Sequence, residues 1–108
     1  MTDAPGAVFD AAYLESYTAG DAQIIAEVLA LFRQQADGWL ARLDAPGDGW
    51  RDLAHTIKGS AKGIGAHVLG EVAGAAEFGD AAQAPRVRAA LLDVLAEIEG
   101  YLSRVGGG

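Results

Sequence analysis

The sequence predicts an all-α protein: an antiparallel up-down-up-down four-helix bundle with a short additional helix at its N-terminus. Apolar side chains recur at three- and four-residue spacing in several long segments, as they do in helices that bury one face. Short connections separate these segments, which favours antiparallel neighbours. No segment alternates apolar and polar residues with an enrichment of β-branched side chains, so no strand is expected.

The first two predicted helices each begin after an aspartate. Asp10 precedes a short helix that runs to about Tyr17, and Asp21 precedes a long helix that runs to about Leu43. An aspartate at this position accepts hydrogen bonds from the N–H groups of the first turn. The segment 45–49 contains a proline and two glycines and ends the long helix. The apolar stripe of the long helix consists of Ile25, Val28, Leu29, Phe32, Ala36, Trp39, Leu40 and Leu43.

Three further helices are predicted over about Trp50–Ile64, His67–Gly79 and Pro85–Arg104. Gly65 marks a turn after the first of them, and a proline at the first helical position favours the start of the last. The middle helix is rich in alanine and glycine, so we expect it to pack tightly against a neighbour. The chain 1–108 is interpreted as a single domain, with frayed tails at about 1–6 and 106–108.

Composition excludes several classes of function. The net charge of −7 over 108 residues argues against nucleic acid and anionic membranes as partners. The chain has no cysteine, which excludes disulfides and thiolate metal sites. It has neither a signal-peptide pattern nor an apolar run of about 20 residues. We therefore expect a soluble, cytoplasmic protein, with a monomer as the default for a bundle without an extra apolar face.

Unusual features gather around His55 in the central helix. Lys58, Gly59 and Lys62 follow it by three, four and seven positions, so all of them share its helical face. A glycine within a helix costs about 0.5–1 kcal/mol relative to alanine. Gly59 therefore suggests that something approaches the backbone there. Lys58 and Lys62 are the only lysines of the chain, and an anionic visitor such as a phosphate would give both His55 and Lys58 a task.

These residues favour a histidine that carries a phosphoryl group. A neutral imidazole is nucleophilic and is populated at cellular pH. It can accept a phosphoryl group on one ring nitrogen if an acceptor holds the other. Lys58 can balance the charge of the phosphate, and Glu77, on the following helix, is the candidate for orienting the ring.

Two other chemistries are disfavoured by the spacing of residues. A metal site built on His55 and His67 is poorly supported, because these histidines flank a predicted turn and no His-x-x-x-His or Glu-x-x-His pair is present. Hydrolysis is poorly supported because Ser60 points away from His55 and no nucleophile-elbow, phosphate-loop or dinucleotide motif occurs. We interpret His67 as a surface or half-buried residue without a role.

The motif around His55 resembles that of the histidine-containing phosphotransfer (HPt) domain of bacterial and fungal phosphorelays. The family motif is essentially Ala-His-x-Leu-Lys-Gly-Ser/Ala, followed by Leu-Gly-Ala, a leucine and a Leu-Glu-like pair. The matching residues here are the run 54–61, then 64–66, Leu69 and Glu77, with Ile57 in place of the common leucine. The resemblance extends over nearly the whole chain.

The resemblance implies a role for each of five residues. His55 would carry the phosphoryl group on the ring nitrogen farther from the backbone, and Glu77 would hydrogen-bond the other ring nitrogen. Lys58 would contact the phosphoryl group, with Lys62 also in its surroundings. Gly59 would leave room for the partner domain to dock.

The resemblance also implies the partners. His55 would attack the aspartyl phosphate of one receiver domain and later pass the group to a second, so the expected partners are receiver domains of response regulators and of a hybrid histidine kinase. The receiver would bring Mg²⁺, so neither a cofactor nor a metal site is expected in this chain. Such domains do not bind ATP or phosphorylate themselves, which implies a phosphocarrier without autokinase activity. Leu14 and Ile24 are candidates for a docking surface around His55.

Two alternatives remain open at this stage. The chain could be a helical interaction module that passes no phosphate, in which case His55 could be replaced without loss of function. It could instead be the phosphate-accepting domain of a chemotaxis-type kinase, with which a glutamate at position 77 is compatible.

Overall fold

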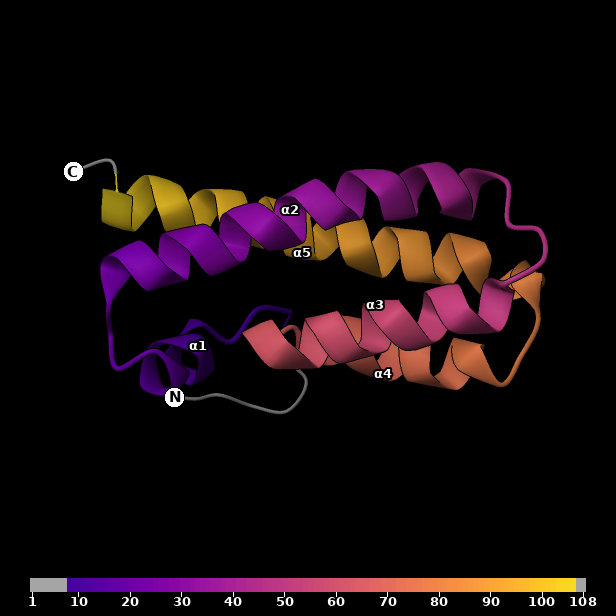
Figure 1. Ribbon diagram of the computed structural model, residues 1–108, viewed down its shortest axis with the longest axis horizontal. Coiled ribbons are helices and arrows are strands. Elements are labelled where there is room, and N and C mark those ends of the chain that lie inside the picture. Colours follow the sequence, from indigo (N-terminus) through magenta and orange to yellow (C-terminus); the bar gives the residue numbers. More distant parts are fainter. Residues whose placement is uncertain (1–7, 107–108) are drawn as a thin grey trace.

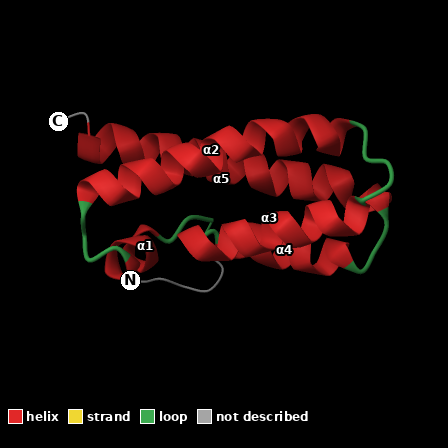
Figure 2. Cartoon of the chain, viewed as in Figure 1, coloured by secondary structure: helices red, strands yellow, loops and turns green. Residues whose placement is uncertain are grey.

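The computed structural model of the chain describes residues 8–106, and within them it contains helices and connecting loops but no strand (Figures 1 and 2). The predicted all-α class is therefore confirmed. A short 3₁₀ helix, η1, precedes the last α-helix and was not predicted from the sequence. The elements are α1 (Ala11–Tyr17), α2 (Ala22–Asp44), α3 (Trp50–Ile64), α4 (His67–Glu77), η1 (Ala81–Gln83) and α5 (Ala84–Gly106).

The four longer helices form an up-down-up-down bundle. Helices α2 and α5 lie side by side in one layer and α3 and α4 in the other, and successive helices run in opposite directions (Figure 1). Contacts join α2 to α3, α3 to α4, α4 to α5 and α5 back to α2. Helices α2 and α5 have 23 residues each, whereas α3 has 15 and α4 has 11. Helix α1 lies at the end of the bundle that the shorter pair does not reach (Figure 1).

Aspartates begin the first two helices, as the sequence predicts. The Asp10 carboxylate accepts a hydrogen bond from the Tyr13 N–H at 3.0 Å. The Asp21 carboxylate accepts from the N–H groups of Gln23 and Ile24 at 3.0 and 3.1 Å. These bonds satisfy N–H groups that have no partner within their own helix.

The end of α3 is fastened to the segment that precedes α1. Gly65 has a left-handed backbone with φ of +85°, and the Ala66 N–H donates to the Ala61 carbonyl at 2.9 Å, an arrangement typical of a helix C-terminus. The Gly65 carbonyl accepts from the Asp10 N–H at 2.9 Å. A Cβ atom at Gly65 would lie 2.7 Å from the Asp10 carbonyl oxygen. Both the backbone angle and the close approach therefore require glycine.

Three expectations from the sequence are corrected. Leu14 was a candidate for the docking surface, but it is only 1% exposed and belongs to the core, because α1 packs on the bundle through it. The fourth helix ends at Glu77 rather than Gly79. Helix α5 runs from Ala84 to Gly106 rather than from Pro85 to Arg104, since glycine weakens a helical backbone without forbidding it. Tails were predicted at about 1–6 and 106–108, but Gly106 is the last residue of α5; residues 1–6 and 107–108 lie outside the described residues.

None of the helices in the described part of the chain is both long and apolar enough to cross a membrane.

We predict that Gly65→Ala destabilises the fold. A left-handed backbone costs a residue with a side chain about 1–2 kcal/mol, and the new methyl group would also displace the Asp10 carbonyl. The free energy of unfolding, measured with urea, checks this prediction. The control is Gly63→Ala, since a Cβ atom there would have nothing within 4 Å. Equal stability of Gly65→Ala and the unmodified protein would contradict this account of the turn.

Candidate functional site

The His55 side chain lies on α3 with its ring against α4. The side chain is 64% exposed, and its Nδ1 atom lies 2.9 Å from Oε2 of Glu77. An ionised carboxylate can only accept hydrogen bonds, so the neutral ring donates its proton from Nδ1. This tautomer leaves the lone pair on Nε2, which makes Nε2 the nucleophilic atom. This is the contact that the sequence analysis assigned to Glu77.

The Glu77 carboxylate is shared between His55 and Lys58. Glu77 is the last residue of α4 and is only 8% exposed. Its Oε1 atom lies 3.0 Å from Nζ of Lys58 and is otherwise buried without a hydrogen-bond partner. The Lys58 ammonium therefore compensates a carboxylate charge that burial would make costly. One buried side chain of α4 thus holds two functional side chains of α3.

The Lys58 ammonium is also the main reason why the pKa of Glu77 lies below its ordinary value of 4.5. Burial acts in the opposite direction, and contact with His55 lowers the pKa further. The carboxylate is therefore ionised at neutral pH, as its hydrogen bond to Nδ1 requires.

Two glycines of α4 make room for the two lysines. A Cβ atom at Gly74 would lie 3.1 Å from Cδ of Lys58, and a Cβ atom at Gly70 would lie 3.1 Å from Cγ of Lys62. The small residues that predicted a close helix approach therefore accommodate the aliphatic stems of side chains from α3. The Lys58 side chain passes over Gly74, and its ammonium group reaches the Glu77 carboxylate.

No contact within the fold requires a glycine at position 59. It lies in the interior of α3, it is exposed, and a Cβ atom there would meet nothing within 4 Å. Lys62, one turn further on, is exposed and forms no ion pair within residues 8–106. Both residues face solvent beside His55.

The surface around His55 has two different flanks. On the flank towards α4 lie the two lysines. On the flank towards α2, a shallow groove separates α2 from α3, and the exposed side chain of Ile24 lies one turn before it on α2. The groove is lined by Val28, Leu31, Phe32, Gln35, Ser60, Gly63 and Ile64.

The second histidine belongs to a different contact. Nε2 of His67 lies 3.1 Å from Oδ2 of Asp10, and the Tyr13 ring packs edge-on against the imidazole. His67 is the first residue of α4 and Glu77 is the last, so the two lie about 15 Å apart along the helix. His67 therefore fastens α1 to α4 rather than joining His55. Over residues 8–106, no three histidine or acidic side chains are grouped so as to hold a metal ion.

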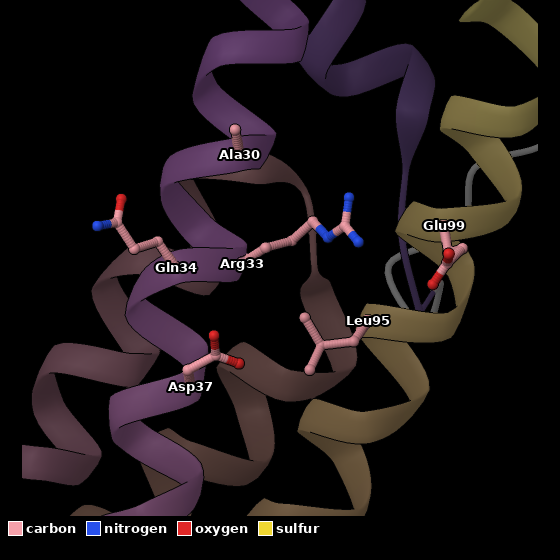
Figure 3. A pocket seen from close by; sticks show the side chains of 6 residues that line it. All are labelled: Ala30, Arg33, Gln34, Asp37, Leu95 and Glu99. Atoms are coloured by element: carbon pink, nitrogen blue, oxygen red, sulfur yellow. The ribbon is translucent and has the colours of Figure 1, made fainter. Parts of the chain in front are cut away.

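A larger hollow lies between α2 and α5, away from these residues (Figure 3). It has a volume of about 510 Å³, and no residue of α3 or α4 lines it. Its Arg33 side chain is accompanied by the acidic side chains of Asp37 and Glu99, so the hollow has no single sign of charge. It is not part of the site around His55.

The sequence analysis missed two residues that touch the end of α4. Trp50 Nε1 donates to the Ala76 carbonyl at 3.0 Å, and Arg51 Nε donates to the Glu77 carbonyl at 3.4 Å. Arg51 precedes His55 by four positions, so helical spacing alone places it on the same face. That spacing was the available signal for Arg51. Trp50 was predicted only as a core residue, and no signal pointed to its hydrogen bond.

Comparison with known proteins identifies the family. The family model of the Hpt domain matches residues 25–101, which include every residue proposed for the site. The chain belongs to the Hpt domain family. This Hpt chain is therefore a histidine phosphocarrier of the phosphorelay class.

A solved structure agrees with this assignment. The crystal structure of the histidine phosphotransferase ShpA from Caulobacter crescentus is similar to this one, with a TM-score of 0.72 and 44% sequence identity. The match covers 91% of this Hpt chain and 97% of ShpA. No curated protein matches the sequence.

We predict that Glu77→Gln lowers stability in a pH-dependent way. A carboxyl group whose pKa is lowered by folding stabilises the fold above its unfolded-state pKa and loses that contribution on acidification. The unmodified protein should therefore be the more stable at pH 7. The difference should shrink as the pH falls through 4.5 and below. Urea unfolding of both proteins across this range checks the prediction, and a difference that grows on acidification would contradict it.

Proposed function

We propose that His55 accepts a phosphoryl group from the aspartyl phosphate of one receiver domain and passes it to an aspartate of another. The observation that supports this proposal most directly is the contact between Nδ1 of His55 and the Glu77 carboxylate at 2.9 Å. It reserves Nε2 as the nucleophile, and the side chain is largely exposed to solvent, where a partner can reach it.

The transfer step uses the residues that surround the ring. Nε2 forms a bond to phosphorus while the bond between phosphorus and the aspartate oxygen breaks, which leaves the aspartate as a free carboxylate. The imidazole becomes positively charged, and Glu77 stabilises that charge through the Nδ1 proton. Lys58 has three N–H donors, so it can keep its contact with Glu77 and also contact the phosphoryl group. The reverse sequence delivers the group to the second receiver.

The two flanks of the His55 surface support a protein partner. The lysines give local positive charge to a chain whose net charge is −7, which favours an acidic docking site. The apolar groove between α2 and α3 offers surface that a partner can bury. Gly59 lets the partner approach the backbone of α3 beside the reacting ring.

The remaining expectations are part of the same proposal. We assign the Mg²⁺ needed for transfer to the receiver domain, and we assign the generation of the phosphoryl group to a separate kinase. The chain then acts as a monomeric carrier between two receivers.

We predict that a phosphorylated receiver domain labels this protein at His55. Transfer from a purified ³²P-labelled receiver should give an acid-labile, base-stable label, because phosphorus is bonded to nitrogen. His55→Ala should remove the label and His67→Ala should retain it. Label on His55→Ala would contradict the site. No label on any protein across several donor receivers would favour the interaction module.

We predict that Gly59→Ala separates stability from transfer. Replacing an exposed helical glycine should raise the free energy of unfolding by about 0.5–1 kcal/mol, because a Cβ atom there meets nothing. The same methyl group should raise the receiver concentration needed for half-maximal transfer. Gly100→Ala on α5 is the matched control and should stabilise the fold without affecting transfer. Unchanged transfer kinetics in Gly59→Ala would remove Gly59 from the docking surface.

A further inference from the structure

The reactive site depends on a weakly supported end of a helix. Helix α4 has 11 residues, of which Gly70 and Gly74 are two, and helices of this length are marginal by themselves. The last carbonyl groups of any helix have no partner within it, and the end frays unless other groups bind them. Glu77 is the last residue of α4. The carboxylate that orients His55 therefore belongs to a residue whose backbone carbonyl has no hydrogen-bond partner within α4.

The Gly79 N–H donates to the Ala76 carbonyl at 3.1 Å, and two residues at the start of α3 also bind this end. The Trp50 indole donates to the Ala76 carbonyl at 3.0 Å in the interior, and the Arg51 side chain donates to the Glu77 carbonyl at 3.4 Å. The Arg51 guanidinium also lies 5.4 Å from the centre of the Phe78 ring, within the range of a cation–π contact. Phe78 is the residue that follows the helix, and it is 73% exposed. Consecutive residues of α3 thus bind consecutive carbonyls of α4.

The same face of α3 that binds the backbone of Glu77 also binds its carboxylate. Arg51, His55 and Lys58 are separated by four and three positions, so they lie in one row along the helix. Figure 1 shows why one helix can do both: the start of α3 lies beside the end of α4. The backbone of Glu77 is therefore held independently of its side chain.

We propose that Arg51, together with Trp50, is a positioning residue for the reaction at His55. It acts by holding the last turn of α4, so that the Glu77 carboxylate stays on Nδ1 in the free protein and also when Lys58 contacts a phosphoryl group. Without this support, Glu77 would be free to follow Lys58, and Nδ1 would lose its acceptor. The kinetic part of this proposal rests on the proposed phosphoryl transfer at His55; the structural part does not.

The test measures the tautomer of the His55 ring. Nitrogen-15 NMR of the imidazole, recorded at a pH where the ring is neutral, reports which nitrogen carries the proton. Arg51→Met keeps an unbranched apolar stem but removes the guanidinium and its donors, and Arg51→Lys restores a positive donor. Trp50→Phe removes the second donor while keeping an aromatic ring. Arg86→Met on α5 is the matched control, because it makes the same change at an exposed position of a helix without site residues.

In the unmodified protein we expect the proton to reside on Nδ1. Arg51→Met should shift the ring towards a mixture of tautomers and slow phosphoryl acceptance about tenfold, the lower end of the losses seen when outer partners of metal-binding histidines are removed. Trp50→Phe should shift the tautomer in the same direction, Arg51→Lys should recover part of the loss, and Arg86→Met should change neither quantity.

An unchanged tautomer in both Arg51→Met and Trp50→Phe would overturn the proposal, whatever happens to the rate. Because the NMR measurement needs no receiver domain, failure of the phosphorelay function would be recognised separately. In that case the unmodified protein would take up no label, while the tautomer would still respond to Arg51→Met.

Discussion

The arrangement of the whole site depends on one buried carboxylate. Glu77 is the only charged side chain in the core of the described residues, and a buried charge is tolerated only when partners compensate it. His55 and Lys58 are those partners, at 2.9 and 3.0 Å. Both come from α3, so α3 and α4 must lie close together along this stretch. The glycines of α4 allow that approach, since Lys58 crosses α4 over Gly74.

This constraint divides the work among the helices. Helix α3 carries the reactive ring, its cation and the donors that hold the end of α4, whereas α4 contributes one functional side chain, that of Glu77. Helices α2 and α5 extend beyond this pair (Figure 1), and α1 closes the exposed end through Leu14. The ring is therefore held by a rigid element on one side and remains open to a partner on the other, as a carrier that must exchange its cargo requires.

Sequence patterns predicted most of the fold because its signals are local. The caps at Asp10 and Asp21 and the turn at Gly65 can all be recognised within a few residues, and the structure contains all three. The burial of Leu14 could not be predicted, because seven residues of α1 are too few to define an apolar stripe. Helical spacing shows which residues share a face, but not how that face is rotated against the next helix.

For the candidate site, too, spacing predicted the contacts within one helix but not those between helices. Spacing along one helix grouped His55 with Lys58, and the family motif added Glu77 as the acceptor. The sharing of Glu77 between His55 and Lys58 depends on how α4 is rotated against α3, which no spacing within one helix reveals. Spacing places Arg51 on the face of His55, but its role was missed because its partner is a backbone carbonyl of α4, which no residue type identifies.

The central claim is that Glu77 occupies Nδ1 and thereby reserves Nε2 for the phosphoryl group. The most direct test is phosphorus-31 NMR of the phosphorylated protein with nitrogen-15 in its histidine rings, where coupling identifies the nitrogen bonded to phosphorus. The account predicts that phosphorus is bonded to Nε2 of His55. A bond to Nδ1 would mean that Glu77 does not hold that atom when the reaction takes place, and it would contradict the account.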